Sequence, residues 1–171
     1  MRSGSQFAGT VLPVRESDLP ELLALMRAYC DFYEVHPEDG ALMALSRALL
    51  ADPAAEGVQL LARDASGRAV GFATVFWSWS TARAARLGVM NDLFVSPQAR
   101  GSGAAQALIA ACLQRCRERG AEAMEWETAL DNARAQAVYD AVGGVRERWL
   151  SYSIELGATG RPLASCRLPW P

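Results

Sequence analysis

The feature that most constrains the fold of this chain is the segment 91–105, which reads Asn-Asp-Leu-Phe-Val-Ser-Pro-Gln-Ala-Arg-Gly-Ser-Gly-Ala-Ala. It begins at the end of an apolar stretch, 87–95, passes a turn at 96–97 and continues through a glycine-rich loop at 100–103. An Ala- and Leu-rich stretch follows without a break, so the segment predicts a strand, a loop and a helix. The first N–H groups of a helix have no partner within it, and the helix dipole is positive there, so this loop suits an anion.

Three residues of the loop favour a phosphate as that anion. Gly101 and Gly103 let the backbone approach a phosphate without a Cβ atom in the way, and Arg100 adds a permanent positive charge. A P-loop is excluded because it requires a lysine, and all 17 basic residues of the chain are arginine. A dinucleotide fingerprint is excluded because it requires a third glycine where Gln106 stands.

Residues 98–104, Gln-Ala-Arg-Gly-Ser-Gly-Ala, resemble the pyrophosphate loop of the GNAT N-acetyltransferases, Gln/Arg-x-x-Gly-x-Gly/Ala, which grips the diphosphate of acetyl-CoA. An ordinary glycine turn is the alternative for this motif taken alone. A second GNAT signature follows at 124–144: a strand, a loop with Asn132, a short helix with Tyr139 and then a glycine. Two motifs in the family's order argue against coincidence, and the resemblance spans residues 11–156.

A narrower resemblance is to the diamine (spermidine/spermine) N-acetyltransferase branch. That branch reads Val-Gly-Phe-Ala and then Glu-Asp-Phe-Phe-Val, where this chain has Val-Gly-Phe-Ala at 70–73 and Asn-Asp-Leu-Phe-Val at 91–95. Asn91 stands where the branch has a glutamate proposed as the catalytic base. The polyamine assignment is therefore weaker than the family assignment.

The order of the expected elements indicates an α/β fold, in agreement with the resemblance. The resemblance implies a mixed, mostly antiparallel GNAT-type sheet with splayed central strands and flanking helices. We expect strands at 9–14, 58–63, 69–79, 86–95 and 121–128. Helices are expected directly after a capping box formed by Asp18 and Glu21, and at 40–50, 102–119 and 132–142. A final hairpin is expected to pair 145–148 with 150–156. One acetyltransferase domain at 9–156 is expected between a disordered tail, 1–8, and a Pro-containing tail, 157–171.

Composition excludes several other classes of function. The net charge of −2 argues against nucleic-acid binding. No apolar run approaches the roughly 20 residues of a membrane span, and the N-terminus lacks an apolar signal region, so we expect a cytoplasmic protein without a membrane partner. The four cysteines lack the spacing of metal ligands, so we expect no metal and a role in core packing.

For the proton donor of the reaction, the resemblance implies Tyr139, which matches the family tyrosine that protonates the sulfur of CoA. A phenol suits this task because its pKa of about 10 lies near that of a thiol. The alternative is a helix tyrosine that packs its ring and leaves its hydroxyl in water.

Asp92 and Glu127 are the candidate bases, each near the end of a central strand. A carboxylate inside an apolar strand needs a partner, so Asp92 either meets a cationic substrate or water, or pairs with Arg83 or Arg86. At least one of Glu125 and Glu127 is expected simply to face solvent.

The acceptor side is expected in segment 29–39, which combines aromatic rings with four carboxylates and borders the acceptor site in the family. Aromatic faces and carboxylates suit a cation, although a packed core and a solvated helix end are the alternatives. Trp77 and Trp79 share one face of their strand and are expected to extend this wall. The predicted substrate-binding residues are Tyr29, Asp31, Tyr33, Glu34, Trp77 and Asn91.

The resemblance implies that acetyl-CoA binds to the backbone of the central strand, to the glycine-rich loop and to the helix that carries Tyr139. The predicted cofactor-binding residues are Leu93, Phe94, Val95, Arg100, Gly101, Ser102, Gly103, Ala104, Ala105, Asn132 and Ala135. Asn132 is also a good helix N-cap, and the two roles are compatible.

We therefore predict an acetyl-CoA-dependent N-acetyltransferase that moves an acetyl group directly to a primary amine of a small, cationic acceptor. Acetylation of proteins is one alternative, and an acyl-CoA-binding or sensing module with little turnover is another. The C-terminal tail is expected at a subunit contact of a homodimer.

Overall fold

The computed structural model of the protein describes residues 7–154 and 156, and the chain divides into two compact units, Met1–Glu127 and Thr128–Pro171. The predicted tail at 157–171 lies outside the described residues, as does the tail at 1–8 except for Phe7 and Ala8, which belong to no helix or strand.

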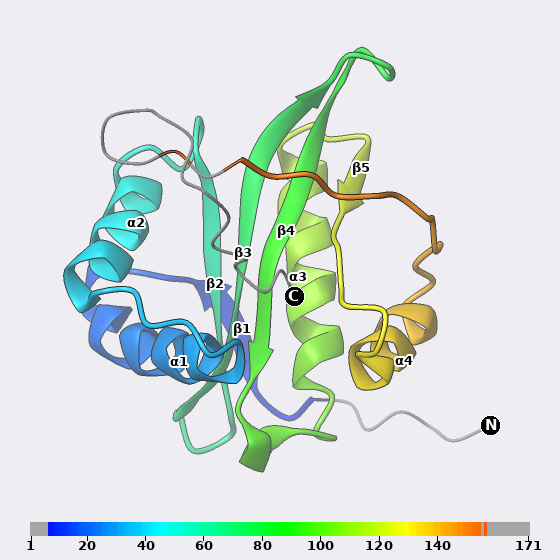
Figure 1. Ribbon diagram of the computed structural model, residues 1–171. Helices are drawn as coiled ribbons and strands as arrows, with labels where there is room; N and C mark the ends of the chain where they lie inside the picture. The colour runs from blue at the N-terminus through cyan, green and yellow to red at the C-terminus, as the bar shows by residue number, and fades with distance from the viewer. Residues whose placement is uncertain (1–6, 155, 157–171) are drawn as a thin grey trace. The chain divides into compact units, whose positions relative to one another are not determined.

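The first unit is built on a five-stranded sheet in the order β1-β2-β3-β4-β5 (Figure 1). All neighbouring strands are antiparallel except β4 and β5, which are parallel. A parallel pair needs a crossover connection, and helix α3 supplies it. This is the mixed, mostly antiparallel sheet predicted from the sequence. The strands are β1 Thr10–Pro13, β2 Gly57–Arg63, β3 Ala69–Ser80, β4 Ala85–Val95 and β5 Ala123–Glu125.

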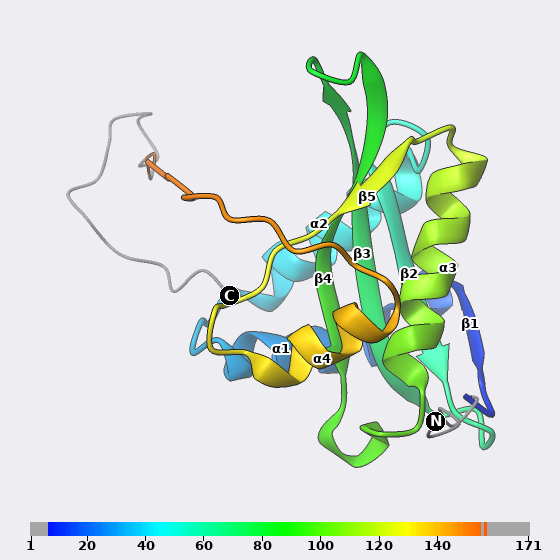
Figure 2. The ribbon, with the colours of Figure 1, turned by 90° about the vertical axis from the view of Figure 1, so that its right-hand side faces the viewer.

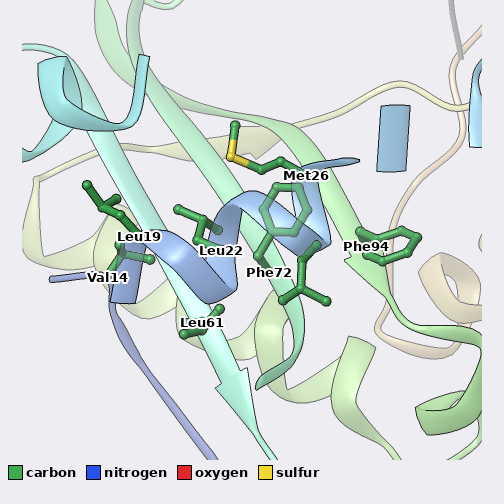
Figure 3. Packing of buried hydrophobic residues seen from close by; sticks show 8 residues of the cluster. Val14, Leu19, Leu22, Met26, Leu61, Phe72 and Phe94 are labelled. Atoms are coloured by element: carbon green, nitrogen blue, oxygen red, sulfur yellow. The ribbon is translucent and has the colours of Figure 1, made fainter. Parts of the chain in front are cut away.

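Helices cover both faces of this sheet. Helices α1 (Leu19–Phe32) and α2 (Asp39–Ala51) lie on one face, and α3 (Ala104–Glu118) lies on the other (Figures 1 and 2). Because α1 turns its apolar stripe toward the sheet, a core forms between them. Figure 3 shows this cluster, in which Leu22 and Met26 of α1 pack against Phe72 and Leu61 of the strands. Its buried members are Val14, Leu19, Leu22, Leu25, Met26, Leu61, Phe72 and Phe94.

The predicted capping box at the start of α1 is wrong. Asp18 makes no side-chain cap hydrogen bond to α1. Its carboxylate instead accepts the backbone N–H of Arg15 at 2.9 Å and pairs with Arg63 of β2 at 2.8 Å. Glu21 also pairs with Arg63, at 2.6 Å. A guanidinium from a distant strand therefore competes for both carboxylates, and local spacing does not reveal it.

The second unit contains helix α4 (Ala133–Ala141), whose ends each lie one residue inside the predicted range 132–142. The side chain of Asn132 caps it by accepting the N–H of Ala135 at 3.1 Å, and Gly143 follows it at a positive φ of 86°. The predicted final hairpin is wrong for the described residues, because 145–154 contain no strand. Alternating apolar residues mark one face of a strand, but a strand forms only where a partner accepts its hydrogen bonds.

Candidate active site

Strand β4 is paired along the whole of one edge but along only part of the other. It pairs with β3 from Ala85 to Val95, whereas its register with β5 covers only Leu87–Val89. From residue 90 to residue 95, therefore, the β5 side of β4 has no partner strand within the part of the chain that the structure describes. The pairing of β4 with β5 thus ends early, which agrees with the splayed central strands that the family resemblance implies.

The register identifies which backbone groups point to that open side. The N–H of Ser96 donates to the carbonyl of Val70 at 2.9 Å. In an antiparallel pair such bonds recur at every second residue, so Phe94 and Asp92 also direct their N–H groups to β3. The N–H groups of Leu93 and Val95 consequently point away from β3.

A β-bulge interrupts β4 next to this edge. Thr74 of β3 faces Asp92, whereas the next residue, Val75, faces Met90, so Asn91 is an additional residue on β4. A bulge bends a strand and redirects its side chains. Asn91 is exposed, and its amide donates to the Asp92 carboxylate at 3.1 Å.

The glycine-rich loop joins β4 to α3 through a short 3₁₀ turn, η2 (Pro97–Ala99). Gly101 and Gly103 have φ angles of 78° and 87°, which side-chain-bearing residues rarely adopt. Gly103 is the N-cap of α3, so the first N–H groups of the helix, from Ala104 onward, lack helical partners. Two positive-φ glycines before a helix N-terminus make a backbone surface that fits a diphosphate.

Two side chains of the loop are used to hold it in shape. Arg100 donates from Nε to the carbonyl of Val95 at 3.3 Å, and the Ser102 hydroxyl donates to the carbonyl of Ala99 at 2.7 Å. The exposed guanidinium of Arg100 therefore lies beside the end of β4.

Asp92 is partly buried and accepts side-chain hydrogen bonds from Thr74, Tyr29 and Asn91. Burial raises the pKa of this carboxyl above its ordinary value, and the hydrogen bonds oppose the rise. The expected alternative, an ion pair with Arg83 or Arg86, does not occur. Arg83 pairs with Glu125 at 3.6 Å, and Arg86 lies 4.7 Å above the ring of Trp79.

Tyr29 of α1 and Tyr33, the C-cap of this helix, accompany Asp92. The rings of Tyr29 and Tyr33 meet edge-on with centroids 4.9 Å apart, and Tyr29 also contacts Phe72 and Phe94 of the core shown in Figure 3. Burial raises the pKa of both phenols. The structure thus brings three of the predicted residues, Tyr29, Tyr33 and Asp92, into one hydrogen-bonded group.

The acidic end of α1 has an unusual backbone. The N–H of Val35 donates to the carbonyl of Cys30 at 3.1 Å and that of Glu34 donates to Asp31 at 3.1 Å, the two bonds of a Schellman motif. Glu34 occupies the left-handed position of this motif, with a φ of 56°, where glycine is favoured. Asp31 and Glu34 are both exposed.

Trp77, which the sequence predicts at the acceptor, lies away from this group. Trp77 is on the opposite face of the sheet, where it contacts Pro53 at 2.9 Å through its indole N–H and lines a cavity with Arg115 and Arg119. Glu127 is exposed and follows the end of β5. Asn132, Ala135 and Tyr139 belong to the second unit, where they lie on or next to α4.

The described cysteines are poor nucleophiles. Burial raises the pKa of the Cys112 thiol to about 12, and it also raises the pKa values of Cys30 and Cys116. Cys166 lies outside the described residues. Within the described part of the chain, no cluster of three or more His, Cys, Asp or Glu side chains is placed to hold a metal ion, and no helix has the length and hydropathy needed to cross a membrane.

Sequence reasoning missed Gln59 and Thr74. Both are polar residues inside apolar strands, with only 4% and 0% of their surfaces exposed. The signal was the polar side chain itself, because a buried polar group needs a hydrogen-bond partner. The identity of that partner depends on strand register, which the sequence does not provide.

Comparison with known proteins agrees with this geometry. The N-acetyltransferase YhfO of Bacillus subtilis (strain 168), described as uncharacterized, is 29% identical over 129 residues, which cover 75% of this chain and 85% of that protein. The crystal structure of a probable acetyltransferase is 26% identical with a TM-score of 0.76, covering 86% of this chain and 98% of the other.

A further solved structure, AAC(6')-Iy in complex with the bisubstrate analogue CoA-S-monomethyl-acetylneamine, shares the fold. It is 24% identical, with a TM-score of 0.72 over 86% of this chain and 98% of its own. Residues 22–143 match the pattern of the Acetyltransferase (GNAT) family. Because that match covers well over half of the sequence, this chain belongs to the GNAT acetyltransferase family.

Proposed function

We propose that the protein transfers an acetyl group from acetyl-CoA directly to a primary amine of a small, cationic acceptor. The observation that carries this proposal is the position of Asp92. This carboxyl has a raised pKa and lies on β4 next to Leu93, whose N–H points to the open edge of the strand. A base and a hydrogen-bond donor for a carbonyl oxygen are thus adjacent in the chain.

The residues present fit acetyl-CoA. The N–H groups at the start of α3 and the guanidinium of Arg100 would hold the diphosphate. The N–H groups of Leu93 and Val95 would hold the pantetheine amide and the acetyl carbonyl oxygen. Asn132 and Ala135 are assigned to the cofactor by family resemblance. When bound, acetyl-CoA supplies an acetyl group activated as a thioester.

Asp92 would act as the general base that removes a proton from the amine, and Tyr139 would act as the general acid for the departing sulfur. An amine attacks only after it loses its proton, and a carboxyl whose pKa is raised by burial is a stronger base than an ordinary carboxylate. The Tyr139 hydroxyl would donate a proton to the departing sulfur. Raised thiol pKa values at Cys30, Cys112 and Cys116 disfavour an acetylated cysteine intermediate, which supports direct transfer.

The acceptor would bind between Asp92 and the end of α1. Asp31 and Glu34 supply negative charge, and Tyr29 and Tyr33 supply aromatic surface, which together suit an ammonium group. The strained backbone of Glu34 supports a functional role, because strain of this kind concentrates at functional sites. A diamine is the narrower proposal, and Asn91 in place of a glutamate weakens it.

The proposal is tested by incubating the protein with acetyl-CoA and each member of a panel of amines, and measuring the release of the CoA thiol. The panel would contain polyamines, amino acids, aminated antibiotics and a lysine-containing peptide. We expect turnover with a small polycation and a loss of about 10²-fold or more in kcat for Asp92→Asn.

The double variant Asp31→Asn/Glu34→Gln should raise the acceptor KM and spare the acetyl-CoA KM. Turnover of the peptide alone would favour protein acetylation instead. Tight acetyl-CoA binding without turnover of any amine would favour a sensing module.

A further inference from the structure

A row of three polar side chains crosses the sheet beneath α1. In the register of the strands, Gln59 of β2 faces Thr74 of β3, and Thr74 faces Asp92 of β4. Directly opposed residues project from the same face of a sheet, so the three side chains are neighbours. The row runs beside the apolar row formed by Leu61, Phe72 and Phe94.

Hydrogen bonds connect the row. Gln59 donates from Nε2 to the Thr74 hydroxyl at 3.3 Å, and the Thr74 hydroxyl bonds to the Asp92 carboxyl. The hydroxyl of Thr74 has only one proton, and it already accepts from Gln59. It therefore donates its proton to Asp92 when that carboxyl is ionised.

One atom of the row has no partner. The Oε1 atom of Gln59 is buried and, among the described residues, accepts no hydrogen bond. An orphaned buried acceptor is costly and calls for an explanation. Protonation of Asp92 gives the Oε1 atom of Gln59 a hydrogen bond to accept. The Asp92 O–H then donates to Thr74, whose own proton needs a new acceptor, and rotation of the Gln59 amide presents Oε1 to it.

We propose that Thr74 and Gln59 are positioning residues that hold the Asp92 carboxyl in one orientation both before and after it takes a proton from the acceptor. This rests on the proposed function, in which Asp92 is the base. In that step an N–H bond of the substrate ammonium breaks, its electron pair stays on nitrogen, and an O–H bond forms on Asp92. The Thr74 and Gln59 row reverses its hydrogen bonds at the same time.

The groups that contact Asp92 directly among the described residues do not change charge in the same pH range, whereas Asp31 and Glu34 lie farther along the chain at the exposed end of α1. Helix α1 and its C-cap contribute the Tyr29 and Tyr33 phenols and the Cys30 thiol, and burial raises the pKa of each, so they stay neutral. On β4, Asn91 is uncharged. Because the Thr74 and Gln59 variants leave Asp31 and Glu34 unchanged, a difference in the titration of Asp92 between variant and wild type reports its hydrogen bonds.

Thr74→Val tests the proposal because it keeps the shape and removes the hydroxyl, while Thr74→Ser keeps the hydroxyl. The Asp92 carboxyl would be titrated by carbon-13 NMR in the protein alone, with its resonance assigned by Asp92→Asn. Loss of a hydrogen bond to an ionised group should move the Thr74→Val midpoint upward by about one pH unit. Thr74→Ser should titrate like wild type.

Gln59→Met is a second variant, and it keeps the test available if Thr74→Val does not fold. It should move the Asp92 midpoint upward by less than Thr74→Val, because Thr74 still donates. It should also lower kcat by about tenfold, because the carboxyl is less firmly oriented. Circular dichroism would confirm that each variant is folded.

Wild-type titration of Asp92 in both folded Thr74→Val and folded Gln59→Met would overturn the positioning role. The acidic limb of kcat/KM for the acceptor should move with the NMR midpoint in each variant. If the midpoint moves and the rate profile does not, the positioning role stands and the assignment of Asp92 as the base fails.

Discussion

Replacing Gly88 with alanine should destabilise the first unit, because α3 leaves no space for a side chain there. A Cβ atom at residue 88 would lie 2.3 Å from the Sγ of Cys116 and 3.2 Å from Cγ1 of Val75. Favourable contacts between heavy atoms lie near 3.5–4.0 Å, so the Cβ would be at least about 1.2 Å too close to the sulfur. Overpacking of this kind costs about 1–3 kcal/mol, which corresponds to a fall in Tm of roughly 2–12 °C.

The double variant Gly88→Ala/Cys116→Ala tests the cause. Cys116 is 3% exposed, and removing its sulfur alone should cost about 1 kcal/mol. In the double variant the new methyl group occupies part of the vacated space, so its loss of stability should be smaller than the sum of the single losses by about 0.5–3 kcal/mol. Urea unfolding of all four proteins measures this coupling.

Gly40→Ala is the matched control, because no atom lies within 4 Å of a Cβ placed at residue 40. It lies at the start of α2, so alanine should leave stability unchanged or slightly raise it. Losses at Gly88 and Cys116 that simply add would refute the reasoning, as would a Gly88→Ala variant as stable as wild type.

Three further variants test other residues. Tyr139→Phe should lower kcat by about 10²-fold or more with little change in KM, and normal turnover would exclude Tyr139 as the acid. Burial holds the native pKa of Asp92 above its ordinary value, so its contribution to stability is full at low pH and is lost as pH rises through the native pKa. Asp92→Asn should therefore unfold at higher denaturant concentration than wild type at neutral pH but not at low pH, and equal stabilities at neutral pH would contradict this. Glu34→Gly should raise stability by up to about 1 kcal/mol by relieving its positive φ, while the acceptor KM rises, and an unchanged KM would remove Glu34 from the acceptor site.

The elements were predictable where local pattern determines them. The β4–loop–α3 unit follows from an apolar run, a pair of glycines and a helical repeat, and α4 follows from Asn132 and Gly143 as its caps. The capping of α1 was not predictable, because Arg63 reaches Asp18 from another strand.

The site was predictable only in part, for the same physical reason. Asp92 stood out as a carboxylate in an apolar strand. Its partner Thr74 and the next residue of the row, Gln59, depend on the register of three strands, and that register exists only after folding. Trp77 was placed with the acceptor by its residue type, but it lies on the α3 face beside Arg115.

Calorimetric titration with acetyl-CoA tests the central claim most directly. Wild type should bind, and Gly103→Asp should weaken binding by at least about tenfold, because it places a negative charge where the diphosphate would lie. Gly67→Asp is the matched control: its φ of 85° resembles the 87° of Gly103, so it carries the same charge and backbone strain, but it lies in the β2–β3 turn. The account predicts wild-type affinity for Gly67→Asp. Absence of binding to wild type, or equal binding by folded Gly103→Asp, would contradict it.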